Sequence, residues 1–184
     1  MKTPSLKKNF VVYLVRTLIF SLAPLVMFPY ASRILGVDGI GKVQYAQSIA
    51  SYFELLAGLG ITHYAVREGA KVRDDPAKLG KLLSELLTIN FVAAGIALVL
   101  YAGVIFTVPG LGGYRGLLLL FALEVLFNGV TFEWLYNIIE DYTYITVRTT
   151  IFQVISFAVL FLFVRDENDF FWYAVTLVLP YVLT

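Results

Sequence analysis

The chain contains no cysteine and a single histidine among its 184 residues. Disulfides and thiolate metal sites are therefore excluded, and a structural zinc site, which is built from Cys and His ligands, lacks candidates. Charge is also scarce: charged residues make up 15% of the chain and hydrophobic residues 59%, and the mean hydropathy is +0.80. A soluble domain of this length carries more charge, so the composition predicts an integral membrane protein.

Hydrophobic runs long enough to cross a bilayer, about 20 residues each, recur along the chain. We predict an all-α membrane fold with about five complete transmembrane helices and a truncated sixth. The predicted spans are residues 9–31, 42–64, 85–108, 116–139 and 144–164, and the sixth begins at residue 170 and stops at Thr184.

The connections between these spans carry turn and cap signals. Residues 34–41 (ILGVDGIG) are rich in glycine and are predicted to form the turn between the first two spans. Residues 67–83 are predicted to be the long basic connection between the second and third spans. Within it, Asp75 and Pro76 are typical of an N-cap and a first helical residue, so we expect a helix to begin there.

Lys and Arg residues are concentrated in alternate connections, which sets the predicted orientation. With the N-terminus in the cytoplasm, the outer set is Arg33, Lys42, Arg115 and Arg165. The cytoplasmic set is larger: Lys2, Lys7, Lys8, Arg67, Lys71, Arg73, Lys78, Lys81 and Arg148. Because the cytoplasmic side of a membrane protein carries the excess of Lys and Arg, we predict a multi-pass protein with a cytoplasmic N-terminus.

Polar residues gather on one face of the second span. At about 100° per residue on a helix, one stripe covers roughly a third of the circumference. It consists of Gln44, Gln47, Ser48, Ser51, Glu54, Gly58 and Thr62. Polar faces within membranes usually point to a bundle interior or a wet cavity, so the stripe indicates a protein that moves something polar through a bilayer.

Three ionisable residues are predicted at membrane depth, and each has more than one role open. Arg16 lies about 10 Å inside the first span. It could reach the headgroups, contact an anion through its planar donor fork, or pair with Glu54. Glu54 fits a buried charge pair between helices or a coupling site for a proton or cation, and Glu124, on the same face as Asn128, is a second candidate for these roles.

Small residues recur along the third span, and catalytic motifs are absent from the sequence. Gly95, Ala97 and Gly103 are predicted to be helix-packing positions. The chain has no His-Glu-x-x-His, no Gly-x-Ser-x-Gly and no large loop that could hold a donor and an acceptor. We therefore expect that it is not an enzyme.

Several short motifs occur in an order and spacing that resemble a known family. They are residues 28–36 (FPYASRILG), 39–42 (GIGK), 45–48 (YAQS), 52–53 (YF), 58–61 (GLGI), 64–68 (YAVRE) and 132–136 (FEWLY). Together they resemble the N-terminal part of bacterial polysaccharide flippases. These are the O-antigen and capsule repeat-unit exporters of the multidrug/oligolipid/polysaccharide superfamily.

This resemblance implies a function. The chain would flip undecaprenyl-diphosphate-linked oligosaccharide across the bacterial inner membrane by alternating access, for surface polysaccharide biosynthesis. Arg16 would contact the diphosphate, and Gln44, Gln47 and Ser51 would face the sugar or the cavity water. No cofactor is expected, and an H⁺ or Na⁺ gradient could drive transport.

The chain length fits a single lobe of a two-lobed exporter, at about 20 residues per span. We therefore expect residues 1–184 to be an N-terminal transmembrane lobe, truncated or split at its C-terminus, which works with a second lobe or as a homodimer. The other expected partners are lipid-linked oligosaccharide and membrane lipids, with no nucleic acid and no metal. Two alternatives remain open. One is a cation-coupled drug or organic-cation antiporter of the same superfamily, and the other is a non-transporting remnant or assembly subunit.

Overall fold

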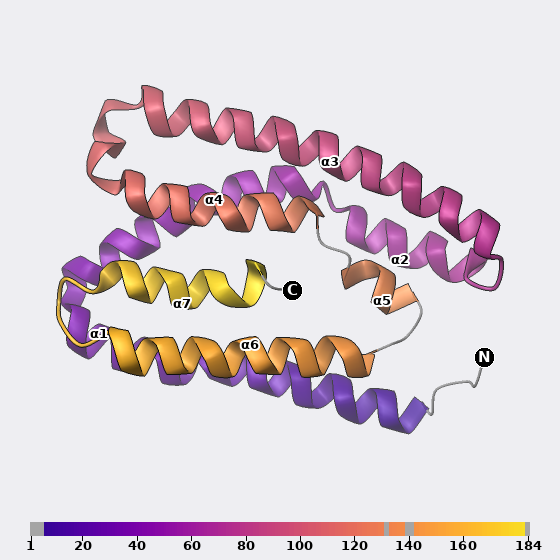
Figure 1. The fold of residues 1–184 in the computed structure, drawn as a ribbon, viewed down its shortest axis with the longest axis horizontal. Helices are drawn as coiled ribbons and strands as arrows, with labels where there is room; N and C mark the ends of the chain where they lie inside the picture. Colours follow the sequence, from indigo (N-terminus) through magenta and orange to yellow (C-terminus); the bar gives the residue numbers. More distant parts are fainter. Residues whose placement is uncertain (1–5, 131–132, 139–141, 183–184) are drawn as a thin grey trace.

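The computed structural model is a layered arrangement of helices (Figure 1). It describes residues 6–130, 133–138 and 142–182, and no strand occurs in these ranges. The elements are α1 (Leu6–Gly58), α2 (Ile61–Val72), α3 (Pro76–Thr107), the 3₁₀ helix η1 (Pro109–Tyr114), α4 (Arg115–Val130), α5 (Glu133–Ile138), α6 (Tyr142–Phe163) and α7 (Phe170–Val182). The predicted all-α fold is confirmed.

Several of these helical stretches are apolar and long enough to cross a membrane. They are Leu14–Val72, Pro76–Thr107, Pro109–Ile138 and Thr143–Phe163, and Phe170–Tyr181 is a shorter apolar helix. The first stretch has 59 residues. At about 1.5 Å per residue it is far longer than a hydrocarbon core of about 30 Å, so it must bend rather than cross once.

That bend corrects the prediction for residues 34–41. No loop separates the first two predicted spans, because α1 is helical on both sides and leaves helical geometry only at Gly36, with φ 65° and ψ −173°. A side chain would strain this backbone conformation, which glycine adopts readily. Gly36 thus divides α1 into a first arm (residues 6–35) and a second arm (residues 37–58), which diverge from the bend in Figure 1.

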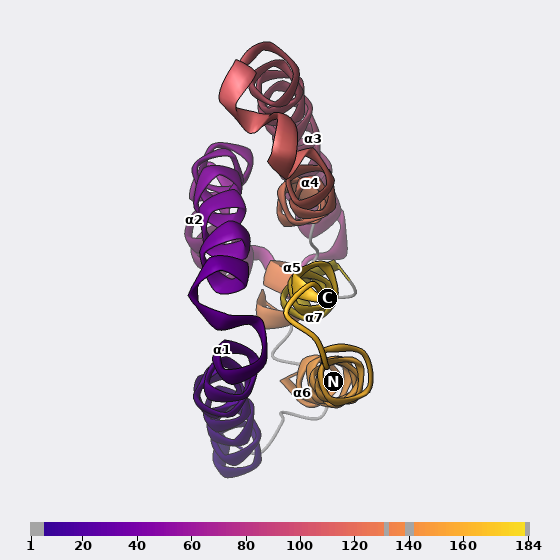
Figure 2. The same ribbon diagram turned by 90° about the vertical axis from the view of Figure 1, so that its left-hand side faces the viewer.

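The two arms pack against different helices. On the first arm, the Tyr30 hydroxyl donates to the Val164 carbonyl just beyond α6 at 3.2 Å, and the Tyr30 ring meets Phe161 edge-on at 4.7 Å between centroids. On the second arm, the Phe53 ring lies 4.9 Å from that of Tyr101 on α3. Helix α7 contacts α1, α4 and α6, and Figure 2 shows it in the layer beside α1.

The chain reverses direction at two opposite ends of the bundle. The Gly36 bend, η1 and the α6–α7 turn lie at one end, and α2, the α2–α3 turn and α5 lie at the other; Figure 2 gives the perpendicular view of the same layers. The connections assigned from the sequence to opposite membrane faces are thus at opposite ends of the molecule. The side chains of Lys2, Lys7 and Lys8 lie outside the described residues, and which end faces the cytoplasm stays a prediction.

The predicted basic connection, residues 67–83, is mostly helical rather than a loop. Helix α2 runs through its first part and α3 begins at Pro76, with Asp75 as the N-cap whose carboxylate accepts from the Ala77 and Lys78 N–H groups at 3.2 Å each. The predicted N-cap is therefore confirmed. A small core formed by Ile61, Ala65, Leu86, Trp134 and Ile138 ties α2, α3 and α5 together.

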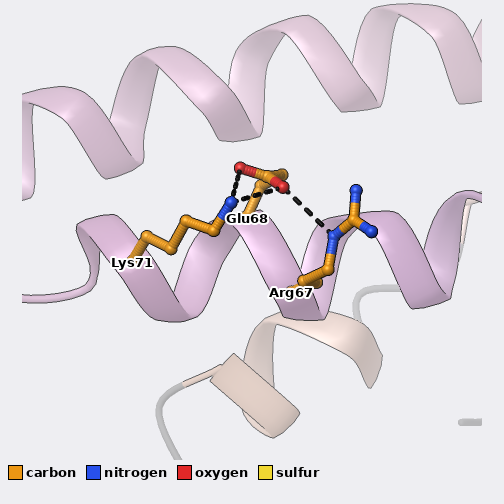
Figure 3. A network of polar contacts seen from close by, with 3 residues as sticks. All are labelled: Arg67, Glu68 and Lys71. Carbon is orange, nitrogen blue, oxygen red and sulfur yellow. Dashed lines mark hydrogen bonds and ion pairs between the residues drawn. The ribbon is translucent and has the colours of Figure 1, made fainter.

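Acidic neighbours balance much of the positive charge in this region. Figure 3 shows Glu68 accepting from Lys71 Nζ at 2.8 Å and from Arg67 Nε at 3.2 Å. Lys78 pairs with Asp75 at 3.0 Å and Lys81 approaches Glu85 at 4.0 Å. Exposed pairs of this kind contribute little stability, but they leave the surface only weakly basic.

Candidate substrate cavity

A cavity of about 280 Å³ lies among the second arm of α1, α4 and the end of α7. Its lining is predominantly polar although the surrounding helices are apolar. The lining residues are Gln44, Gln47, Ser48, Ser51, Glu54, Glu124 and Tyr181. The structure thus brings together five of the six predicted site residues, all except Arg16.

The spacing of residues along α1 explains how the cavity forms. Ser51 and Glu54 follow the two glutamines at intervals of three and four residues, so their side chains share one face of the helix. The adjacent face carries small residues with no exposed surface, Val43, Ala46, Ala50 and Ala57. Small side chains let neighbouring helices approach closely, so this face packs into the bundle and the polar face is turned to the cavity.

Two carboxyl groups meet in the wall of the cavity. Glu54 on α1 and Glu124 on α4 lie within hydrogen-bonding reach of each other. Glu124 is only 4% exposed, and among the described residues neither its Oε1 atom nor that of Glu54 has a hydrogen-bond partner. The pair is therefore a buried acidic site at the contact between two helices.

Neighbouring polar groups hold the helices around this pair. The Asn128 side-chain amide on α4 donates to the Glu54 main-chain carbonyl at 3.0 Å. The Tyr101 hydroxyl on α3 donates to the Leu118 carbonyl on α4 at 3.0 Å, and its side chain is buried. These bonds fix α4 against α1 and α3 beside the carboxyl groups.

Arg16 lies elsewhere, on the first arm of α1. It is half-buried, and its guanidinium carbon is 5.9 Å from the centroid of the Phe20 ring, a cation–π arrangement. No ion pair joins Arg16 to Glu54 among the described residues, and the ionisable partner of Glu54 is another acid. The proposed Arg16–Glu54 pair is thus not formed in this structure, and the other two roles of Arg16 stay predictions.

The structure adds two lining residues that were not chosen as site residues from the sequence. Ser48 belongs to the polar stripe but was not among the predicted site residues. Tyr181 follows Pro180 at the end of α7 and reaches the cavity from a different helix. Tyr181 is one of three hydroxyl-bearing residues in an otherwise apolar helix, with Tyr173 and Thr176, and the sequence does not reveal which of them faces the cavity.

The predicted packing positions of α3 are only partly correct. Ala97 is fully buried, as expected, whereas an added Cβ at Gly95 or Gly103 would meet nothing within 4 Å in this chain. The glycine that makes a close contact with α3 is Gly129 of α4, whose Cβ position is occupied by Ala94. Composition located the small residues but not the helix surfaces that touch.

Comparisons with known proteins identify the family. Residues 6–184 match the family model described as "Polysaccharide biosynthesis protein". The chain belongs to this family. It is therefore a membrane protein of the polysaccharide biosynthesis family with apolar helices long enough to span a bilayer, as the sequence motifs predicted.

Two relatives show how the chain compares with longer proteins. It is 22% identical to the "Putative O-antigen transporter" of Escherichia coli (strain K12) over 148 residues, 80% of this chain and 36% of the relative. It is 42% identical to the "Lsg locus putative protein 1" of Haemophilus influenzae over 52 residues, 28% of this chain and 13% of the relative. The matched part of the chain thus spans about a third of the length of the first relative and a smaller part of the second. No solved structure matches it.

Proposed function

We propose that this chain forms part of the passage by which a lipid-linked oligosaccharide crosses the bacterial inner membrane during surface polysaccharide biosynthesis. The observation that supports this most directly is the open polar cavity between otherwise apolar helices. Amide and hydroxyl groups of Gln44, Gln47, Ser48 and Ser51 can both donate to and accept from sugar hydroxyls. The lipid tail would remain in the bilayer while the headgroup moves along this polar face.

The size of the cavity favours a passage built from more than one lobe. Its volume of about 280 Å³ is at the lower end of the range for small-molecule sites, and an oligosaccharide needs more space. We infer that the cavity is one wall of a larger passage, whose other wall is a second lobe or a second copy of the chain. The bend at Gly36 offers a place where the arms of α1 change their angle in an alternating-access cycle.

Arg16 is the proposed contact for the diphosphate. Its guanidinium group presents a planar fork of donors that matches phosphate oxygens. It lies in the N-terminal half of the first arm of α1. Figure 1 shows the N-terminal end of this arm at the end of the molecule that carries α2 and α5, which we propose is cytoplasmic. In that orientation it would meet the headgroup in the inner leaflet before the sugar enters the cavity, and the chain would act as a transporter rather than an enzyme.

One observation favours a different substrate. The cavity lining contains two carboxyl groups, and no Lys, Arg or His is among the residues that line it. An acidic cavity attracts cations, so a cation-coupled drug or organic-cation antiporter of the same superfamily is the second candidate. The family match supports the polysaccharide substrate over this one.

A blocking substitution tests the proposal. Ser48→Trp places a large ring in the cavity, whereas Val99→Trp adds the same ring to the outer face of α3, where Val99 is 72% exposed. In cells whose only copy of the gene carries the variant, Ser48→Trp should abolish surface polysaccharide and Val99→Trp should not, with equal membrane levels of both. Unchanged polysaccharide with Ser48→Trp, together with lost efflux of a cationic dye, would support the antiporter instead.

A further inference from the structure

We propose that Glu54 and Glu124 form a single proton-binding site in which the two carboxyl groups share one proton. The site lies between α1 and α4, in the wall of the cavity. The site binds a proton rather than a metal ion. Proton binding would be a property of this chain alone, and only its role in driving transport rests on the proposed function.

The two acids are in direct contact. Their carboxyl groups lie within hydrogen-bonding reach, yet two ionised carboxylates offer only acceptors and cannot hydrogen-bond to each other. One proton between them converts the repulsion into a short O–H···O⁻ bond, as in other carboxyl pairs that share a site. A metal cation needs more ligands than this pair supplies, and no group of three or more His, Asp or Glu side chains that could hold one occurs among the described residues.

The surroundings of the pair are poor in charge and in hydrogen-bond partners. Glu124 is 4% exposed, and the Oε1 atoms of both residues are buried without a partner among the residues that the structure describes. The titratable groups that face the pair are phenols, Tyr101 from α3 and Tyr181 from α7. No charged side chain from α3, α6 or α7 is found in the described lining, so no neighbouring cation there compensates a doubly ionised pair.

The pair also lies close to the end of α1. Glu54 precedes the last turn of the helix, after which Leu59 and Gly60 both adopt positive φ, 43° and 67°, and lead into α2. Loss of the shared proton would force the two carboxylates apart and loosen the contact between α1 and α4 beside this break. A proton gradient could thereby act on the angle between these helices, if the chain transports as proposed.

A spectroscopic measurement on the purified protein tests proton binding without requiring transport. Infrared difference spectra between neutral and alkaline pH should show the carbonyl stretch of a buried carboxylic acid, and the band should be absent in Glu54→Gln and in Glu124→Gln. Each substitution supplies an N–H donor to the remaining carboxylate, so the contact persists without a proton. The matched control is Glu85→Gln, because Glu85 is exposed and lies near Lys81, and it should leave the band unchanged.

The alternatives give different spectra. A wild-type protein without such a band at neutral pH would overturn the proposal, as would a band that survives both Gln substitutions. A site that responds to Na⁺ at constant pH, rather than to pH, would identify a cation site and would also overturn it. If the band behaves as expected but the wild-type protein moves no lipid-linked oligosaccharide, proton sharing stands and the proposed function fails.

Discussion

The side-chain amide of Asn128 on α4 donates to the main-chain carbonyl of Glu54 on α1, at 3.0 Å. This bond holds α4 against the last turns of α1 and places Glu124, one turn earlier on α4, against the Glu54 side chain. A side-chain amide between membrane helices is worth about 0.6 kcal/mol on average. Its larger role is to hold α4 at the position along α1 where the two carboxyl groups meet, and this role can be tested.

Asn128→Leu should separate positioning from stability. We expect a small loss of stability in detergent, about 0.6 kcal/mol, because one interhelical hydrogen bond is lost. The infrared carboxyl band of the Glu54–Glu124 pair should shift or broaden, since the register of the helices is relaxed. A band identical to that of the wild type would show that Asn128 does not position the pair.

Gly36→Ala should destabilise the protein through its backbone alone. Gly36 has φ 65°, and an added Cβ would meet no atom within 4 Å, so the cost is conformational, of order 1–3 kcal/mol. Gly41→Ala is the matched control, because Gly41 also has open space for a Cβ but no positive φ. Melting curves of the purified variants should place Gly36→Ala clearly below Gly41→Ala; equal curves would contradict the role of the bend.

Gly129→Ala should destabilise the protein through packing. The Cβ of the new side chain would overlap Ala94 on α3, and overpacking of this kind costs about 1–3 kcal/mol. Gly103→Ala serves as its control, since the same addition at Gly103 enters open space and improves helix propensity. Size-exclusion chromatography after heating should show that Gly129→Ala aggregates at a lower temperature than Gly103→Ala. The reverse result would show that α3 and α4 are not packed as described.

The cap of α3 predicts a pH dependence. The Lys78 ammonium and the N–H groups of Lys78 and Ala77 hold the pKa of Asp75 below its ordinary value. Because the folded-state pKa is lowered, the stabilisation by the charged carboxylate is present above the unfolded-state pKa and is lost as the pH falls through the folded-state pKa. Asp75→Asn keeps the cap without the charge. Its melting temperature should lie slightly below the wild type at neutral pH and converge with it in acid; a constant difference would contradict the assignment.

Arg16 can be tested with a conservative pair of variants. If it contacts the diphosphate, Arg16→Ala should abolish export of surface polysaccharide and Arg16→Lys should restore only part of it, because Lys keeps the charge but not the donor fork. If Arg16 merely reaches the headgroups, Arg16→Lys should export normally. Membrane levels of each variant, measured by immunoblot, provide the control, and normal export by Arg16→Ala would remove Arg16 from the mechanism.

Hydropathy predicted where the helices lie but not how they join. The span predicted at 144–164 corresponds to α6 (Tyr142–Phe163), and the N-cap at Asp75 was correct because capping is a local property. The change of direction predicted within residues 34–41 does occur, at Gly36, but no loop forms there, because a single glycine with positive φ redirects the helix. Apolar composition reports contact with lipid and carries no information on backbone continuity.

The sequence predicts which residues of one helix share a face of the site, but not which helices meet there. The period of α1 placed Gln44, Gln47 and Ser51 on one face, and the cavity lies on that face. The contact of Glu54 with Glu124 was not predictable, because a helical period does not say which neighbouring face meets it. Arg16 was an equally reasonable partner for Glu54 by depth alone, and the divergence of the arms of α1 excludes that pairing in this structure.

The most direct test of the account is the fraction of lipid-linked oligosaccharide that reaches the outer leaflet. It can be measured in right-side-out membrane vesicles as the share of labelled oligosaccharide that an impermeant lectin binds, with and without the gene for this chain. The account predicts that deletion lowers this share, that the wild-type gene restores it, and that Ser48→Trp does not. An unchanged share after deletion would contradict a role for this chain in transport.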